Sequence, residues 1–264
     1  MERNQTKAQP MHAALFISDL HLQQSHPKTA QAFFRFLQQH AVHAEQFYIL
    51  GDLFEYWAGD DDIGSDFNRS VIDAIRKVAD AGVKLFWIGG NRDFLAGEGF
   101  AQATGAVCLS EPHVAVIAGQ SIILAHGDAQ CVDDHAYIEF RNQVRHPEWQ
   151  KQFLAMPLEK RKAIIEGMRI DSREEKQVKS SAIMDVSAAA IADLFRKTEA
   201  SILIHGHTHR PARHDYIIRG RNCQRYVLPE WDFDGVTIQG GWIAIEPDGS
   251  IVRVETDATN LLSV

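Results

Sequence analysis

Seven side chains that can bind metal ions lie in five short polar motifs of this 264-residue chain. The motifs ISDLH, YILGD, WIGGNRD, ILAHGD and ILIHGHTH supply Asp19, His21, Asp52, Asn91, His126, His207 and His209. Mixed oxygen and nitrogen ligands of this kind suit Mn²⁺, Fe²⁺ or Zn²⁺, and the lack of cysteine in the motifs argues against a thiolate site. Two such ions about 3.5–4 Å apart can acidify a water molecule and neutralise charge on a phosphoryl group. The motifs therefore predict a metal-dependent hydrolase of phosphoesters or phosphoanhydrides.

Apolar runs precede most of these motifs and predict the strands that must position them. The strand candidates span residues 13–19, 46–52, 83–91, 121–128 and 200–207, so the polar residues fall at or near their C-terminal ends. In open α/β sheets, ligand sites form at that edge. We expect Asp19 and His21 to share one face of an extended segment, because side chains alternate along a strand. Asp52, directly after a glycine, is the candidate for a carboxylate that bridges two metals.

Helical patterns between the first three strands predict a mixed α/β fold. Residues 28–41 and 66–82 read as helices, the second closing on Ala-Gly as a C-cap. This β-α-β-α-β order predicts helices packed on a largely parallel sheet. Residues 113–128 read as a hairpin around Ala-Gly-Gln, and residues 225–231 and 240–255 as further antiparallel strands, the last pair turning at Pro-Asp-Gly. We expect an α/β (α+β) sandwich of two sheets flanked by helices.

Residues 130–199 interrupt this alternation of strands and helices, because they contain three or four predicted helices and no predicted strand. Residues 141–180 contain ten Lys or Arg and six Asp or Glu. The same segment contains a series of apolar residues: Trp149, Phe153, Leu154, Met156 and Leu158. One interpretation is an amphipathic insertion with a solvated charged face. The other is a cap whose apolar face binds acyl chains and whose basic face meets phosphates or anionic lipid. We divide the chain into a core, residues 1–129 and 200–264, and a helical cap, residues 130–199.

Composition excludes several functional classes. The formal net charge of −8 argues against general nucleic-acid binding, which usually shows as a basic excess. No N-terminal apolar segment resembles a signal peptide, and no run approaches the roughly 20 apolar residues of a membrane span. Three widely spaced cysteines form neither a disulfide framework nor a CxxC site, which favours a reducing cytoplasm.

Two further residues of the motifs have open roles. Arg92 could make a charge-assisted contact to a phosphate, or a surface ion pair with Asp93. His205 stands one residue too early for the His-x-His pair; we expect it to support the ligands, with direct ligation as the alternative. No Ser-His or Cys-His arrangement points to a covalent nucleophile.

The motifs DLH, GD, GN, HGD and GHTH, in this order, resemble the calcineurin-like metallophosphoesterase superfamily. Within it the chain resembles the UDP-2,3-diacylglucosamine pyrophosphohydrolase family of bacterial lipid A biosynthesis. That resemblance rests on SDLHL (18–22), YILGDLFEYWAGDDD (48–62), GNRDFL (90–95), HGDAQCVDDHAY (126–137), SSAIMDV (180–186) and LIHGHTHRPA (203–212). Arg92 stands where many superfamily members have histidine, as is typical of the lipid A family. The segment LPEWDFDG departs from the usual Gly-x-Trp pattern.

The resemblance implies a specific reaction and site. Two Mn²⁺ ions would be bound by the seven residues named above, and water would attack the α-phosphorus to release UMP and the acylated sugar phosphate. Asp52, Asn91, Arg92 and His126 would be catalytic. Substrate contacts would come from Asn91, Arg92, Asp134, Ser172, Lys176, Lys179 and His207. A lipid substrate implies a cytoplasmic protein associated peripherally with the inner membrane, without nucleic acid or an obligate protein partner.

Two other functions compete with this one. A related two-metal phosphodiesterase could act on a soluble nucleotide or phosphodiester, although such a substrate does not explain an insertion that is both basic and apolar. The fold could also serve as a non-catalytic scaffold, but scaffolds of this kind tend to lose ligand histidines, and this chain keeps all four.

Overall fold

The computed structural model describes residues 10–178 and 185–256, and of residues 170–178 it describes the helical backbone alone. A six-stranded sheet has the order β11-β10-β1-β2-β3-β4. Its strands are β1 (His12–Ile17), β2 (Ala44–Ile49), β3 (Lys84–Trp87), β4 (Val107–Cys108), β10 (Gly240–Ile245) and β11 (Ile251–Thr256). The first four run parallel, as the β-α-β-α-β pattern predicts, and β10 and β11 add an antiparallel edge.

A second, five-stranded sheet has the order β5-β6-β7-β9-β8. Its strands are β5 (His113–Ile117), β6 (Gln120–Leu124), β7 (Ile202–His205), β8 (Arg213–Ile218) and β9 (Arg221–Val227). The expected hairpin at Ala118-Gly119 joins β5 to β6. The segment 225–227 lies in this sheet, parallel to β7 and antiparallel to β8, and does not pair with residues 240–255. Strand β8 begins with three polar residues and has alternately exposed and half-buried side chains, and it was missed in the sequence.

The core between the sheets follows from the alternation of side chains along their central strands. In β1, Ala14 and Phe16 pack against the five-stranded sheet, whereas Leu15 and Ile17 pack against helices on the opposite face. A strand buried on both faces needs an apolar residue at every position, which is why this segment reads as a continuous apolar run. Phe16 stacks on Tyr48 of β2 with ring centroids 4.9 Å apart.

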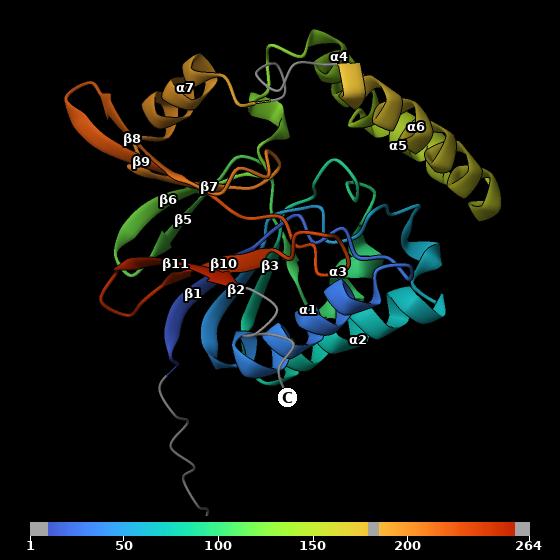
Figure 1. The fold of residues 1–264 in the computed structure, drawn as a ribbon, viewed down its shortest axis with the longest axis horizontal. Helices are drawn as coiled ribbons and strands as arrows, with labels where there is room; N and C mark the ends of the chain where they lie inside the picture. The colour runs from blue at the N-terminus through green and yellow to red at the C-terminus, as the bar shows by residue number, and fades with distance from the viewer. Residues whose placement is uncertain (1–9, 179–184, 257–264) are drawn as a thin grey trace, which may run out of the picture.

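Helices cover the outer faces of both sheets (Figure 1). The six-stranded sheet is covered by α1 (Pro27–Gln39), α2 (Asp66–Asp80) and α3 (Glu98–Thr104). The loops also contain three short 3₁₀ turns: η1 (Ala41–His43), η2 (Asp60–Asp62) and η3 (Asp128–Gln130). Helix α7 (Ala188–Thr198) covers the five-stranded sheet, where Ile191 and Phe195 pack against Ile123 and Leu203. The predicted two-sheet sandwich flanked by helices is confirmed.

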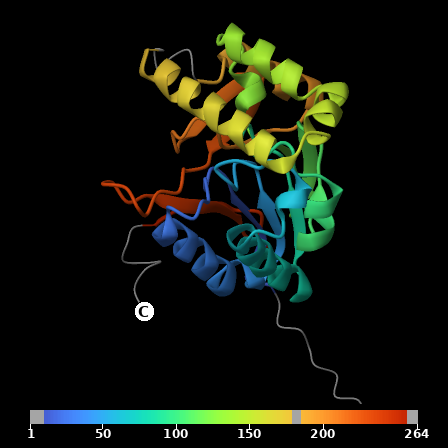
Figure 2. The ribbon, with the colours of Figure 1, turned by 90° about the vertical axis from the view of Figure 1, so that its right-hand side faces the viewer.

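Three helices stand beyond the ends of the strands and apart from these layers (Figure 2). They are α4 (His135–Val144), α5 (Pro147–Leu154) and α6 (Leu158–Val178). Arg161 of α6 is buried, donates to the carbonyl of Ala58 and pairs with Asp61, while Lys162 lies 2.7 Å from Asp62. Part of the basic charge of this segment therefore attaches α6 to the acidic η2 turn of the core.

Helix α4 is attached to the core in the same way. Arg141 donates to Asp128 at 2.8 Å and to Glu111 at 3.0 Å, and Arg145 donates to the carbonyl of Gly90 at 2.9 Å. The three acceptors lie in the loops that follow β3, β4 and β6, so the basic residues of α4 join the helix to the strand ends. Among the residues that the structure describes, no helix is both long and apolar enough to span a membrane.

The packing of α7 leads to a prediction about stability. Phe195→Ala should lower the free energy of unfolding by about 3–5 kcal/mol, because the side chain is fully buried between α7 and the sheet. Equilibrium urea unfolding followed by circular dichroism measures the change. Leu154→Ala, at a side chain that is 39 % exposed, is the control and should cost no more than about 1 kcal/mol. Equal effects of the two substitutions would show that α7 adds little to the core.

Candidate metal centre

The loops after β1, β2 and β7 are joined at one edge of the sandwich by hydrogen bonds from main-chain N–H groups. Leu20 N and His21 N both donate to the carbonyl of Asp52, at 2.9 and 3.0 Å. His207 N donates to the carboxylate of Asp19 at 2.9 Å, and Trp231 N donates to the Asp19 carbonyl at 3.0 Å. Loops from both sheets therefore meet at Asp19, and the predicted ligands are brought to one place by the backbone.

Most of the predicted ligands have a left-handed backbone. Positive φ angles occur at Asp19 (55°), His21 (48°), Asp52 (52°), His207 (65°) and His209 (54°). The other non-glycine residues with positive φ among those described lie in two hairpin turns and at the end of α7. Such conformations cost about 1–3 kcal/mol each and persist where the surroundings enforce them, often at functional sites. The expectation that Asp19 and His21 lie on an extended segment is wrong, because the strand has ended at Ile17.

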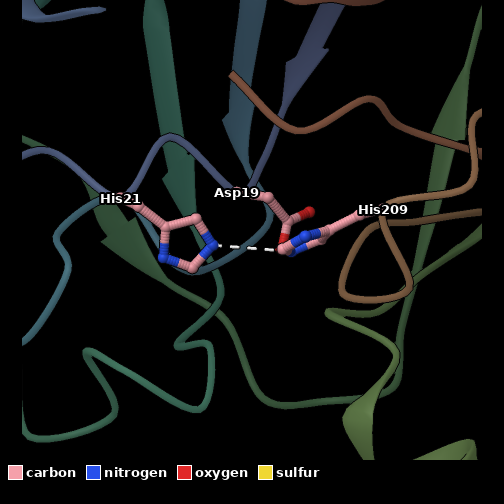
Figure 3. Close-up of side chains that lie close together, drawn as sticks. All are labelled: Asp19, His21 and His209. Carbon is pink, nitrogen blue, oxygen red and sulfur yellow. Dashed lines mark hydrogen bonds and ion pairs between the residues drawn. The ribbon is translucent and has the colours of Figure 1, made fainter. Parts of the chain in front are cut away.

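One group of donors consists of Asp19, His21 and His209, whose ligand atoms lie within 4.8 Å of one another (Figure 3). The Nε2 atoms of the two histidines are 3.5 Å apart, and Nε2 of His209 is 3.4 Å from Oδ1 of Asp19. A carboxylate and two imidazoles facing one point are a donor set that suits a divalent cation.

A second group of donors adjoins the first. Asp19, Asp52 and His126 also present ligand atoms within 4.8 Å of one another. Oδ2 of Asp52 lies 3.7 Å from Nε2 of His126 and 3.9 Å from Nε2 of His21, so this carboxylate stands between the two groups. Oδ1 of Asn91 is 3.0 Å from Nε2 of His126. It is also 2.9 Å from Nδ1 of His207. The structure thus brings all seven predicted ligands together.

Two glycines permit this close approach. A Cβ atom on Gly90 would lie 2.1 Å from Oδ1 of Asp52, and one on Gly206 would lie 2.1 Å from Oδ2 of Asp19. Real Cβ atoms do not approach other atoms so closely, and a buried carboxylate cannot move away without losing its hydrogen bonds. The glycines of GGN and HGH are therefore required for the carboxylates to occupy their present positions.

The donor cluster favours positive charge. Burial would raise the pKa of Asp19, but the imidazoles of His209 and His126 hold it well below its usual range. Burial would lower the pKa of His126, but carboxylates led by Asp52 and Asp19 raise it to about 9. Burial and the neighbouring His126 lower the pKa of His207 to about 3, so its ring is neutral with a lone pair available. A cation bound here would replace the proton on His126.

Sequence reasoning missed or misassigned some residues that support the cluster. Asp93 does not pair with Arg92; it is fully buried and accepts from the main-chain N–H groups of Gly90 (2.8 Å) and Leu53 (2.8 Å). Its position three residues after a glycine in a tight loop was the available signal. His205 turns away from the donors, because Nδ1 faces the Gly206 carbonyl at 2.8 Å and Nε2 faces a buried arginine of β9.

A cavity of about 540 Å³ opens beside the donors. At one end it is lined by donors and by Arg92; toward the helices its walls are apolar, with Phe140 of α4, Trp149 and Phe153 of α5 and Met168 of α6. Trp149 and Phe153 stack with ring centroids 4.8 Å apart. A polar end beside an apolar chamber suits a molecule that joins a phosphate to hydrocarbon.

The structure places the predicted substrate contacts unequally. Asp134, Asn91, Arg92 and His207 line the cavity. Ser172 and Lys176 lie in α6 where only the helical backbone is described, and Lys179 lies outside the described residues. Tyr137 was not predicted; it lines the cavity and donates to Asp128 at 2.7 Å.

The position of Asp52 between the two donor groups leads to a prediction about metal content. Asp52→Ala should lower the amount of divalent metal bound per chain and abolish hydrolysis, because its carboxylate is the candidate bridge between the two donor groups. Elemental analysis of the dialysed protein measures the metal, and circular dichroism checks the fold. Asp80→Ala is the control: Asp80 pairs with Arg76 on the exposed surface at the end of α2, so metal content should not change. Full metal content in Asp52→Ala would show that the bridge is misassigned.

Comparison with known proteins agrees with this architecture. Residues 13–211 match the model of the calcineurin-like phosphoesterase family. The UDP-2,3-diacylglucosamine hydrolase of Aromatoleum aromaticum is 49% identical over 84% of this chain and 90% of that protein. The Serratia proteamaculans protein of the same name is 43% identical over 94% of this chain and 97% of its own length. The Vps29 single mutant from Entamoeba histolytica is a more remote match, with 14% identity and a TM-score of 0.41 over 92% of this chain and 99% of that one. The chain belongs to the calcineurin-like phosphoesterase family and, within it, to the group of UDP-2,3-diacylglucosamine hydrolases.

Proposed function

We propose that this protein hydrolyses the pyrophosphate bond of UDP-2,3-diacylglucosamine in lipid A biosynthesis. The relatives that carry this name cover most of the chain at 41–49% identity. The observation that carries the proposal is the junction of the two-group donor cluster with an apolar cavity between the core and α4–α6. The products would be UMP and 2,3-diacylglucosamine 1-phosphate, with water attacking the α-phosphorus.

Divalent metal binding follows from the family and from the donor groups, and we propose two Mn²⁺ ions per chain. Asp19, His21 and His209 would hold one ion, Asn91, His126 and His207 the other, and Asp52 both. Such ions would supply a water acidified for deprotonation near neutral pH and would neutralise charge on the phosphoryl group. Carboxylate, amide and imidazole donors without thiolate suit Mn²⁺.

Arg92 and Asn91 would orient the pyrophosphate at the polar end of the cavity. The main-chain N–H of Arg92 donates to Oδ1 of Asp52 at 2.8 Å, which fixes the backbone of Arg92 beside the donors. A guanidinium at this point can form charge-assisted hydrogen bonds to phosphoryl oxygens. Ser172 and Lys176 belong to α6, the helix whose Arg169 lines the cavity. These residues, with Lys179 and Asp134, remain our proposal for contacts to the uridine and sugar phosphates.

Helices α4–α6 would act as a cap that receives the acyl chains. The apolar side chains of α5 and α6 at the cavity give a diacyl substrate a surface to bury, at about 0.8 kcal/mol per CH₂ group. Because that substrate resides in a membrane, we propose peripheral association with the cytoplasmic face of the inner membrane. We propose neither nucleic acid nor an obligate protein as a partner.

The substrate proposal is tested by comparing two compounds. Purified protein with Mn²⁺ should release UMP from UDP-2,3-diacylglucosamine, and should turn over a generic aryl phosphodiester at least about 100-fold more slowly, since only the lipid fills the apolar cavity. Chromatography of released UMP and absorbance of the aryl product measure the two rates. Equal turnover would favour the soluble phosphodiesterase, and absence of lipid turnover would contradict the proposal.

The site of attack is tested by isotope labelling and by a substitution. In H₂¹⁸O, attack at the α-phosphorus places ¹⁸O in UMP, whereas attack at the β-phosphorus places it in the sugar phosphate; mass spectrometry distinguishes them. Arg92→Ala should lower kcat/KM by about 10²–10³-fold through loss of charge stabilisation at the phosphoryl group. Arg210→Ala, at an exposed cavity rim residue that pairs with Asp185, is the matched control and should be much milder. Label in the sugar phosphate would overturn the α-phosphorus assignment.

A further inference from the structure

Two glutamates outside the predicted ligand set stand behind the histidines of one donor group. Oε2 of Glu55 lies 3.1 Å from Nδ1 of His21, and Oε2 of Glu230 lies 3.1 Å from Nδ1 of His209. Both carboxylates are at ion-pair distance from the ring nitrogens. The two imidazoles thus have the same environment: Nε2 faces the donor group, and Nδ1 faces a glutamate.

This arrangement determines which nitrogen of each ring can bind a cation. A neutral imidazole has one N–H and one lone pair, and a carboxylate beside Nδ1 favours the tautomer whose proton is on that atom. The lone pairs of His21 and His209 then lie on Nε2, where the two atoms are 3.5 Å apart and Asp19 is adjacent. A carboxylate at the outer nitrogen also makes the imidazole a stronger donor.

The second donor group lacks this support at its buried histidine. Nδ1 of His126 donates to the main-chain carbonyl of Leu50 at 2.9 Å. A carbonyl fixes the tautomer but brings no full negative charge. The two groups therefore differ in what faces Nδ1 of the imidazole: a glutamate at His21 and His209, and a neutral carbonyl at His126, although Asp19 belongs to both groups.

From this difference, we propose that Glu55 and Glu230 are positioning residues that make the Asp19–His21–His209 group the tighter of the two metal sites. This inference rests on the two-metal centre proposed above. The site with two glutamate-backed imidazoles fills first and retains its ion, and the site with Asn91 and His126 fills second and exchanges more readily.

The two glutamates come from parts of the chain with different roles. Glu55 also accepts from Arg169 of α6 at 2.7 Å, so the cavity-lining face of α6 is linked through one carboxylate to His21. Glu230 lies in LPEWDFDG, the segment that departs from the family pattern. The N–H of the next residue, Trp231, donates to the Asp19 carbonyl, which holds the segment against the donor group. The divergent segment therefore places the carboxylate of Glu230 beside the metal ligand His209.

The test is a Mn²⁺ titration of the metal-free protein, followed by the electron paramagnetic resonance signal of free Mn²⁺. The wild type should bind two ions with different affinities. Glu230→Gln and Glu55→Gln should each raise the Kd of the tighter ion by about 10–100-fold, the usual effect of removing such a partner. Asn91→Ala, which removes a donor of the second group alone, should weaken the other ion and leave the tighter one unchanged.

Controls separate this role from a merely structural one. His12 and Glu246 form the same type of pair at 3.1 Å, at the opposite end of β1, so Glu246→Gln should leave both affinities unchanged. Glutamine keeps the size of the side chain and an acceptor, so the unfolding temperature of each metal-free variant should change little. Unchanged affinity of the tighter ion in both glutamate variants, or weakening of the looser ion alone, would overturn the inference while leaving the proposed function intact. Binding of fewer than two ions by the wild type would contradict both.

Discussion

The rest of the site depends on a buried carboxylate at the junction of the two sheets. Asp19 is fully buried, and apart from the hydroxyl of the neighbouring Ser18 its partners come from other loops. His207 N after β7 and His209 beyond it contact the carboxylate, and Trp231 N, on the way to β10, donates to the Asp19 carbonyl. An unpaired buried carboxylate would cost several kcal/mol, so the loops that solvate it are held in one arrangement. The same contacts that satisfy Asp19 gather the histidines, so folding and assembly of the donor cluster are coupled.

Conformational strain accompanies that assembly. Five of the seven predicted ligands have positive φ, and glycines at 90 and 206 let the backbone approach the carboxylates. These features lower stability in the metal-free protein, and they are tolerated because the sandwich around them is extensively packed. A cation that binds the folded donor cluster and not the unfolded chain would offset part of this cost. The strain therefore itself indicates function, independently of any motif.

The basic charge of residues 141–180 has a third use beyond the two that the sequence suggested. Arg141, Arg145, Arg161 and Arg169 turn toward acidic side chains or carbonyls of the core loops. The charge is thus neither simply solvated nor wholly available to phosphates; much of it attaches α4 and α6 over the donor cluster. With the helices attached by charge, their apolar side chains are left to line the cavity, and this is how one segment can be basic and apolar at once.

Local sequence was sufficient for the elements and the ligand types. The apolar runs, the helical periodicity and the Gly-Asp, Gly-Asn and Gly-His motifs depend on neighbouring residues alone, and α1, α2 and the two predicted hairpins formed where these patterns placed them. The pairing of β9 with β7 and the packing of α7 on the second sheet could not be predicted, because strand order depends on long-range contacts.

The sequence by itself determined which atoms could bind metal and that they would follow strands. Only the tertiary structure decided that Asp93 holds the loop instead of pairing with Arg92, that His205 faces away, and that two glutamates far apart in the chain stand behind one pair of histidines. The physical reason is that these roles depend on distance and orientation between residues up to about 190 positions apart, and no local pattern of side chains encodes such distances.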